Sequence, residues 1–290
     1  MPVTLADAIL GTLTVKQMTD GRFSTNAEVV EGLDSSGLDV QQFYGGPSGP
    51  RWAGTSFDLG GVLGGVSATG GLVVSSGTIT LPYRERANLG TFSGSSSHPQ
   101  VNATDGIVLP RGVSLSSDVD ASISLEALLV STNGIASPFS LSNGQTINAD
   151  AHNGRWHLGP VSENGNTVEQ VTGVQIDFGI GIVATSHKGN YPDLAAIRSR
   201  RPKIAITFED FDAADNFAAS HTVMTSAVVY ARKRSGATWV NDGTAQHVKF
   251  SFADGMEQLD SLGASQGENG TGVVTLYGET LTVSAASAIT

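Results

Sequence analysis

The chain has 290 residues and a formal net charge of −11, from 16 Lys and Arg residues against 27 Asp and Glu residues. Only 15% of the residues are charged and 36 are glycine, whereas soluble proteins usually carry about 25% charge and about 7% glycine. The acidic balance disfavours tight binding to a phosphate backbone, the lack of cysteine excludes disulfides and cysteine-ligated metals, and no apolar run approaches the roughly 18 residues of a membrane span.

Short apolar segments recur along the chain and are separated by Gly, Ser, Asn and Pro residues, which favour turns. Several segments alternate with period two: Val248, Phe250 and Phe252 share one face of an extended strand, and residues 204–208 alternate similarly. Such alternation is typical of antiparallel sheets with one face in water. The sequence therefore predicts a mainly β protein, an antiparallel sandwich or barrel with a few short helices. The predicted strands are residues 71–74, 78–83, 106–109, 121–130, 171–184, 203–209, 222–232, 247–252 and 273–284.

Three short segments have the spacing expected of helices. The first lies between Pro192 and Pro202 and ends in arginines, which suit a helix C-terminus. The second is rich in alanine, and the third places Met256, Leu259 and Leu262 at helical spacing. The predicted helices are residues 193–201, 210–220 and 254–262, while residues 5–13 fit either a helix or a strand.

The division into domains depends on a loosely patterned segment in the middle of the chain. Residues 131–165 are rich in Asn, Ser and Gly and fit a linker or a long ordered loop. We therefore expect a β-rich N-terminal region, residues 1–150, which can be a separate module, and a second β-rich region, residues 151–290; a single domain stays open. A second glycine-rich segment, residues 45–71, surrounds Trp52 and Phe57.

No motif in the chain predicts an enzyme, a cofactor site or a metal site. Residues 179–184 fit G-x-G-x-x-A, but a turn follows where a dinucleotide site needs a helix, so a glycine-bearing strand is the preferred interpretation. The six histidines include no zinc-protease pair, and His152 and His157 flank Trp156 in what the sequence predicts as a loop. There is no G-x-S-x-G nucleophile motif. The sequence also gives no reason to select any acidic pair for glycoside hydrolysis.

Charged residues gather in one acidic cluster and two basic clusters. The acidic cluster lacks the internal glycine turn of a calcium loop, so it fits the first turn of a helix, where the helix dipole favours carboxylates. The basic clusters are not interleaved with aromatic residues that would stack on nucleic-acid bases. They are candidates for contacts with carboxylates of a neighbouring subunit, or ordinary solvated charges. The candidate acidic surface is Glu209, Asp210, Asp212 and Asp215, and the candidate inter-subunit contacts are Arg198, Arg200, Arg201, Arg232, Lys233 and Arg234.

The second half of the chain resembles the tail tube, or major tail, proteins of tailed bacteriophages. The resemblance covers roughly residues 170–290 and lies in the order of segments: a short helix and strand over 192–207, an acidic helical segment, a long hairpin through 232–236 and a closing strand over 270–283. It implies a sandwich or barrel that closes into homo-oligomeric rings, and rings that stack into a hollow tube with other tail proteins as partners. It also implies an acidic lumen that passes DNA without binding it, no catalysis, and a location in the virion tail after assembly in the host cytoplasm.

Two other classes of function remain open from the sequence. One is a different part of the virion, such as a capsid decoration or head–tail connector protein. The other is a secreted carbohydrate-binding or hydrolytic β-sandwich, in which Trp52, Trp156 and Trp239 present flat rings to sugars. Tryptophans in such small numbers are more often core or interface anchors.

Overall fold

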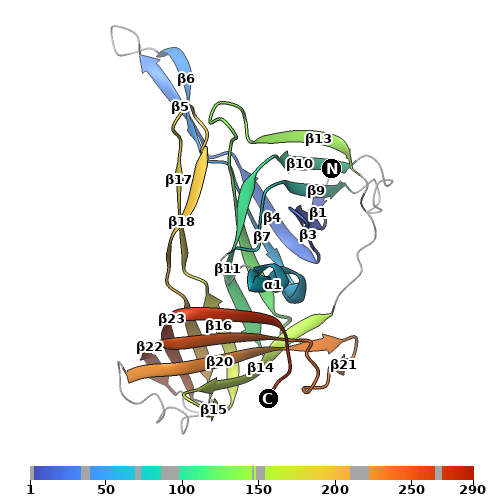
Figure 1. The fold of residues 1–290 in the computed structure, drawn as a ribbon, viewed down its shortest axis with the longest axis vertical. Helices are drawn as coiled ribbons and strands as arrows, with labels where there is room; N and C mark the ends of the chain where they lie inside the picture. The colour runs from blue at the N-terminus through green and yellow to red at the C-terminus, as the bar shows by residue number, and fades with distance from the viewer. Residues whose placement is uncertain are drawn as a thin grey trace.

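The computed structural model describes residues 3–33, 40–68, 73–85, 98–145, 147, 154–209, 222–264 and 270–290. In these residues the protein is mainly β with a single α-helix, and its neighbouring strands run antiparallel. The predicted fold class is therefore confirmed. Figure 1 shows an elongated molecule whose longest strands lie at one end of the long axis, while a narrow hairpin projects at the other.

The largest sheet contains thirteen strands among the described residues and draws on both halves of the chain. Its order is β15-β14-β20-β22-β23-β19-β16-β11-β12-β7-β4, with β21 added beside β20 and β8 beside β11. The alternation recognised in the sequence is present here, because Val248, Phe250 and Phe252 are all buried. In chain order the strands are β4 (Met18–Ser24), β7 (Arg51–Ser56), β8 (Ser75–Ser76), β11 (Gly106–Ser116), β12 (Ser122–Leu129), β14 (Arg155–Glu163), β15 (Asn166–Val168), β16 (Val171–Asp177), β19 (Lys203–Phe208), β20 (Thr222–Ser235), β21 (Thr238–Trp239), β22 (His247–Gly263) and β23 (Thr271–Ser287).

A second sheet of six described strands, in the order β13-β10-β9-β2-β3 with β1 beside β9, lies next to the first. Its strands are β1 (Val3–Leu5), β2 (Ala8–Leu10), β3 (Leu13–Val15), β9 (Ile79–Glu85), β10 (His98–Ala103) and β13 (Phe139–Gln145). Helix α1 (Leu59–Ala68) contacts β3 on one side and the long strands β22 and β23 on the other. One continuous apolar core therefore runs through both sheets and the helix.

Helix α1 lies in the glycine-rich segment 45–71, for which the sequence predicted no helix. Four glycines lower its intrinsic helix propensity. Packing compensates for this, because the aliphatic side chains Leu59, Val62, Leu63 and Val66 are fully buried. The glycines allow close approach: a Cβ added at Gly60 would lie 2.7 Å from the Trp156 ring.

Two of the predicted helices are wrong. Residues 193–201 form β18 (Leu194–Arg200), which pairs with β17 (Ile180–Thr185), and residues 254–262 form the second half of β22. In β22 the helical spacing has no consequence, because Met256 and Leu262 are exposed and the backbone instead pairs with β23. Strand pairing has overridden local propensity in both places. Residues 5–13 contribute to strands β1, β2 and β3, and the predicted helix 210–220 lies outside the described residues.

The long strands change the face they bury part-way along their length. In β22, Phe250 and Phe252 point inward before Asp254, and Glu257 points inward after it. Asp254 itself has a φ of 51°. The same change of parity occurs in the adjoining stretches of β20 and β23. A Cβ at Gly255 would lie 1.9 Å from the carbonyl oxygen of Tyr277, so only glycine fits at this sharp twist. The face of the large sheet that is buried therefore changes at this level, which we call the corner of the sheet.

Candidate assembly surface and basic pocket

The basic residues 232–234 lie at the end of β20, where a tight turn leads into β21. Neighbouring residues of a strand point to opposite faces, so Arg232 and Arg234 share one face while Lys233 points to the other. Strand β14 pairs here with β20 and brings Arg155 opposite Arg234 and His157 opposite Arg232. The structure thus adds Arg155 to a cluster that the sequence had placed on one segment alone.

Trp239 lies between the arginines of this face. It pairs with Arg234 across the β20–β21 hairpin, and its ring centroid lies 5.2 Å from the Arg232 Cζ atom and 5.5 Å from the Arg234 Cζ atom. His157 packs edge-on against the same ring at 5.2 Å. Trp239 is 45% exposed, so its ring also presents apolar surface to solvent. We refer to Arg155, His157, Arg232, Arg234 and Trp239 as the Arg–Trp face.

The sequence-based statement that no aromatic residue is interleaved with this cluster is therefore wrong. The turn at Gly236, which has a φ of 58°, reverses the chain and returns Trp239 to the arginines. A residue five positions downstream becomes a direct neighbour only because the hairpin forms. The hairpin itself was expected, and counting back along it would have identified this tryptophan.

The cations of the cluster differ in how they are neutralised. Asp120 lies 3.2 Å from Arg155 and 3.1 Å from His157, and Asp242 lies 2.8 Å from Arg232. Arg234 donates a hydrogen bond to the carbonyl of Ala237 at 3.4 Å, and no carboxylate of the described residues lies within 4.0 Å of its guanidinium. Arg234 is partly buried next to Trp239, and no described carboxylate neutralises its positive charge. Arg234 therefore favours binding of an anion from outside the chain.

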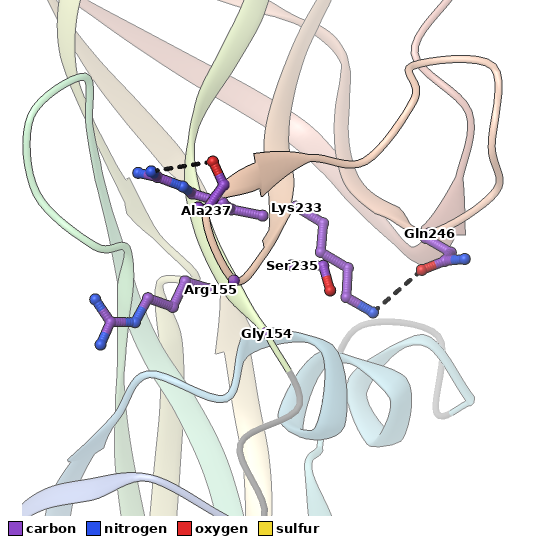
Figure 2. A pocket seen from close by; sticks show the side chains of 8 residues that line it. Gly154, Arg155, Lys233, Ser235, Ala237 and Gln246 are labelled. Atoms are coloured by element: carbon purple, nitrogen blue, oxygen red, sulfur yellow. Dashed lines mark hydrogen bonds between the residues drawn. The ribbon is translucent and has the colours of Figure 1, made fainter.

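A cavity of about 680 Å³ opens beside this cluster. Figure 2 shows the Arg155 and Lys233 side chains leaving β14 and β20 in different directions, with Gln246 opposite the lysine. The Lys233 Nζ atom donates to the Gln246 Oε1 atom at 3.3 Å and lies 5.7 Å from the centroid of the Trp156 ring. The cavity, called the basic pocket below, is lined by Gly154, Arg155, Lys233, Arg234, Ser235, Gly236, Ala237 and Gln246. Three cations and no carboxylate line it, so it suits an anionic group.

The second basic cluster lies on strand β18 rather than at the predicted helix end, and the structure does not merge it with the first. Arg198 and Arg201 are exposed. Arg200 is half-buried and its guanidinium donates to the carbonyl oxygen of Leu281 on β23. Burial lowers the pKa of Arg200 below its usual value. Arg200 therefore ties the β17–β18 hairpin to the large sheet of its own chain, which leaves Arg198 and Arg201 as the available cations.

Of the predicted acidic surface, only Glu209 is among the described residues. It follows β19, and its backbone N–H donates to the carbonyl oxygen of Gln170 at 3.1 Å. Asp210, Asp212 and Asp215 lie outside the described residues. Across the described part of the chain, no group of three or more His, Cys, Asp or Glu side chains has the arrangement of a metal site.

A pair of buried carboxyl groups lies at the corner of the large sheet. Glu163, at the end of β14, and Glu257, on β22 just past the twist, are 2% and 1% exposed, and their carboxyl groups lie close enough to interact. Burial, followed by the neighbouring Glu257 charge, raises the pKa of Glu163 to about 7. The pair therefore holds a proton near neutral pH. No pattern in the sequence pointed to these two residues, because they are far apart along the chain.

A hairpin, called the arm, projects from the rest of the fold (Figure 1). It consists of β5 (Ala27–Leu33) and β6 (Val40–Ser48), which pair with each other and with no other described strand. Figure 1 shows it extending beyond the rest of the molecule. Val29 and Val30 are 66% and 43% exposed, and they point to opposite faces because they are adjacent in a strand. Both faces of the arm therefore offer apolar surface.

The base of the arm is held by the loop between β17 and β18. The Ser48 N–H donates to the Asn190 carbonyl oxygen at 2.7 Å, and the Asn190 side chain donates to the Gly45 carbonyl oxygen at 3.0 Å. Within the same loop, His187 lies 2.8 Å from Asp193, and this hydrogen bond is the main cause that lowers the pKa of Asp193. The arm therefore has a defined attachment to the body of the protein.

Other residues singled out in the sequence have structural positions. Trp52 and Trp156 are buried in the core, so of the three tryptophans only Trp239 presents a ring to solvent. His157 is buried in β14 rather than lying in a loop, and His152 lies outside the described residues. The G-x-G-x-x-A segment forms a turn at Gly179 and strand β17, in agreement with the preferred interpretation.

Comparison with protein-family models and with curated protein sequences identifies no relative. No protein-family model matches the chain, and no curated protein is significantly similar to it in sequence. In the described part of the structure, no helix is both long and apolar enough to cross a lipid bilayer. Function must therefore be inferred from the geometry of the protein itself.

Proposed function

We propose that the chain is a structural protein of a tailed-bacteriophage virion, whose copies associate into stacked rings that form the tail tube. The observation that carries this proposal is the arm. An isolated two-stranded hairpin is at best marginally stable in water, and a hairpin with apolar side chains on both faces invites association. Docking on another copy would cover Val29 and Val30 and supply partners for the outer edges of β5 and β6.

Charge supports the same proposal. The net charge of −11 would repel DNA rather than retain it, which suits a conduit through which the polymer passes. Self-association then needs local complementarity, because copies of equal negative charge repel each other at long range. The Arg–Trp face and the exposed Arg198 and Arg201 are local exceptions to the acidic surface, and they are candidates for contacts between subunits.

The first test is the assembly state of the purified full-length chain. Light scattering after size exclusion, over a hundredfold range of concentration, is expected to show a large oligomer, and negative-stain images are expected to show rings or tubes. Compact trimers or fibres would instead indicate another virion component. A chain that stays monomeric over the whole range would refute the proposal.

The second test removes the apolar surface of the arm. The double variant Val29→Lys/Val30→Lys is expected to remain folded, because both positions are exposed, and to lose most of its assembly. Leu141→Lys is the matched control, since Leu141 is 73% exposed on β13 of the second sheet. Circular dichroism checks the fold of both variants. Equal assembly of the arm variant and the control would rule out the arm as a subunit contact.

A further inference from the structure

The arm and the basic pocket carry side chains of opposite charge. The segment that contains the arm, residues 27–48, includes Glu28, Glu31, Asp34 and Asp39 and no Lys, Arg or His residue. Glu28 and Glu31 lie on β5 and are exposed, while Asp34 and Asp39 lie outside the described residues. The β20–β21 hairpin, which lines much of the basic pocket, lies toward the other end of the long axis (Figure 1).

We propose that the arm of one copy docks on the basic pocket and the Arg–Trp face of the next copy, with Glu28 and Glu31 meeting Lys233 and Arg234. This inference rests on the proposed self-assembly and names the two surfaces that carry it. The occupant of the pocket is thus a carboxylate-bearing β-hairpin of a second copy.

The chemistry of the two surfaces matches in both its polar and apolar parts. Lys233 and Arg234 have no carboxylate partner among the described residues, and a guanidinium binds a carboxylate through two parallel hydrogen bonds. The exposed ring of Trp239 lies beside Arg234 and would cover a valine of the arm. Each face of the arm carries one valine and one glutamate, because residues 28 and 30 share a face and residues 29 and 31 share the other.

A protein carboxylate suits this surface better than a nucleic-acid backbone. Asp120 and Asp242 lie within the same cluster, where they neutralise Arg155 and Arg232 and would repel a continuous run of phosphates. One or two carboxylates on a narrow hairpin can reach Lys233 and Arg234 without approaching either aspartate. The charge of the whole chain adds to the repulsion of a polyanion.

The placement of the two surfaces determines the kind of assembly. Because the arm and the pocket are different surfaces at different ends, their contact is heterologous, with each copy giving its arm to one neighbour and receiving an arm from another. Such contacts build closed rings when the rotation between copies closes, and open stacks when it does not. Either outcome propagates beyond a dimer.

The test is a charge exchange between the two surfaces. One variant reverses the pocket, Lys233→Glu/Arg234→Glu, and the other reverses the arm, Glu28→Lys/Glu31→Lys. Each variant alone places like charges against each other at every contact and is expected to need at least about tenfold more protein to assemble. In an equimolar mixture each contact regains opposite charges, so alternating copies are expected to assemble at close to the wild-type concentration. Rescue that occurs only on mixing would be difficult to explain by a general loss of folding.

Controls separate this inference from the proposed function. Circular dichroism and thermal melts verify folding. If charge reversal prevents the pocket variant from folding, Lys233→Gln/Arg234→Gln replaces it. This neutral variant is expected to weaken assembly, and mixing it with the arm variant is not expected to restore assembly. If the wild type assembles and the reversed variants assemble equally well, or if mixing two folded charge-reversed variants rescues nothing, this inference is wrong and the proposed function stands. A wild type that never assembles overturns both. Retention of a single- or double-stranded oligonucleotide that is lost in the pocket variant, with assembly unchanged, assigns the pocket to nucleic acid and also overturns the inference.

Discussion

The buried pair of Glu163 and Glu257 predicts that the protein becomes less stable as pH rises toward neutrality. The folded state raises the pKa of Glu163 from the usual 4.5 to about 7, so it keeps a proton that the unfolded chain releases above pH 4.5. The contribution of Glu163 to the free energy of unfolding is therefore fully present below about pH 4.5, declines as pH rises, and is lost above about pH 7. One pKa unit corresponds to about 1.4 kcal/mol, so the shift amounts to about 3 kcal/mol at most.

Replacing Glu163 with glutamine should remove this dependence. Glutamine has nearly the same shape as glutamic acid, carries no charge at any pH, and can donate a hydrogen bond from its amide to the Glu257 carboxylate. Glu163→Gln is therefore expected to match the wild type near pH 5 and to exceed its free energy of unfolding by about 1–3 kcal/mol at pH 8.5. Glu279→Gln, at an exposed position on β23, is the matched control and should leave the pH profile of the wild type unchanged.

The assay is urea denaturation from pH 5 to 8.5, followed by the fluorescence of the buried tryptophans. The measurements are best made on the Val29→Lys/Val30→Lys background at low concentration, because self-association would add to the apparent stability. If Glu163→Gln loses stability with rising pH as steeply as the wild type does, the two carboxyl groups do not share a proton, and the reasoning from the corner of the sheet is refuted.

Two further substitutions test the packing of the fold. Gly255→Ala would place a Cβ 1.9 Å from the carbonyl oxygen of Tyr277, so it is expected to destabilise the protein by roughly 2–4 kcal/mol. Gly263→Ala is the control on the same strand; its Cβ would have no atom within 4 Å, so this variant should lose little stability. Equal melting temperatures for the two variants would contradict the tight twist. Asp58→Ala removes the side-chain oxygen that accepts the Gly61 N–H at 3.1 Å at the start of α1, and a loss of about 1 kcal/mol is expected. Asp58→Asn keeps an acceptor and should retain most of that stability, so a loss equal to that of the alanine variant would argue against the cap.

Part of the candidate site could be predicted from the sequence. Arg232, Lys233 and Arg234 are adjacent in the chain, and the turn residues after them predicted a hairpin, so this basic cluster was found without a structure. Arg155 and Trp239 were missed, because they join the cluster only through the pairing of β14 and β21 with β20. The arm was missed for a different reason: its strand pattern lies in a segment where charge, glycine and apolar residues alternate without a clear period.

The sequence by itself determined that the protein is mainly β, because period-two alternation depends only on neighbouring residues and is visible in segments such as 204–208 and 247–252. Predictions from local residue spacing were wrong where long-range contacts competed with it. Residues 254–262 have helical spacing but pair with β23. Helix α1 forms despite its four glycines because its aliphatic side chains are buried. The meeting of Glu163 with Glu257 was decided only by the tertiary structure. The two residues lie on strands β14 and β22, which flank β20 in the large sheet, and a contact between residues so distant in sequence leaves no mark on the local pattern of either strand.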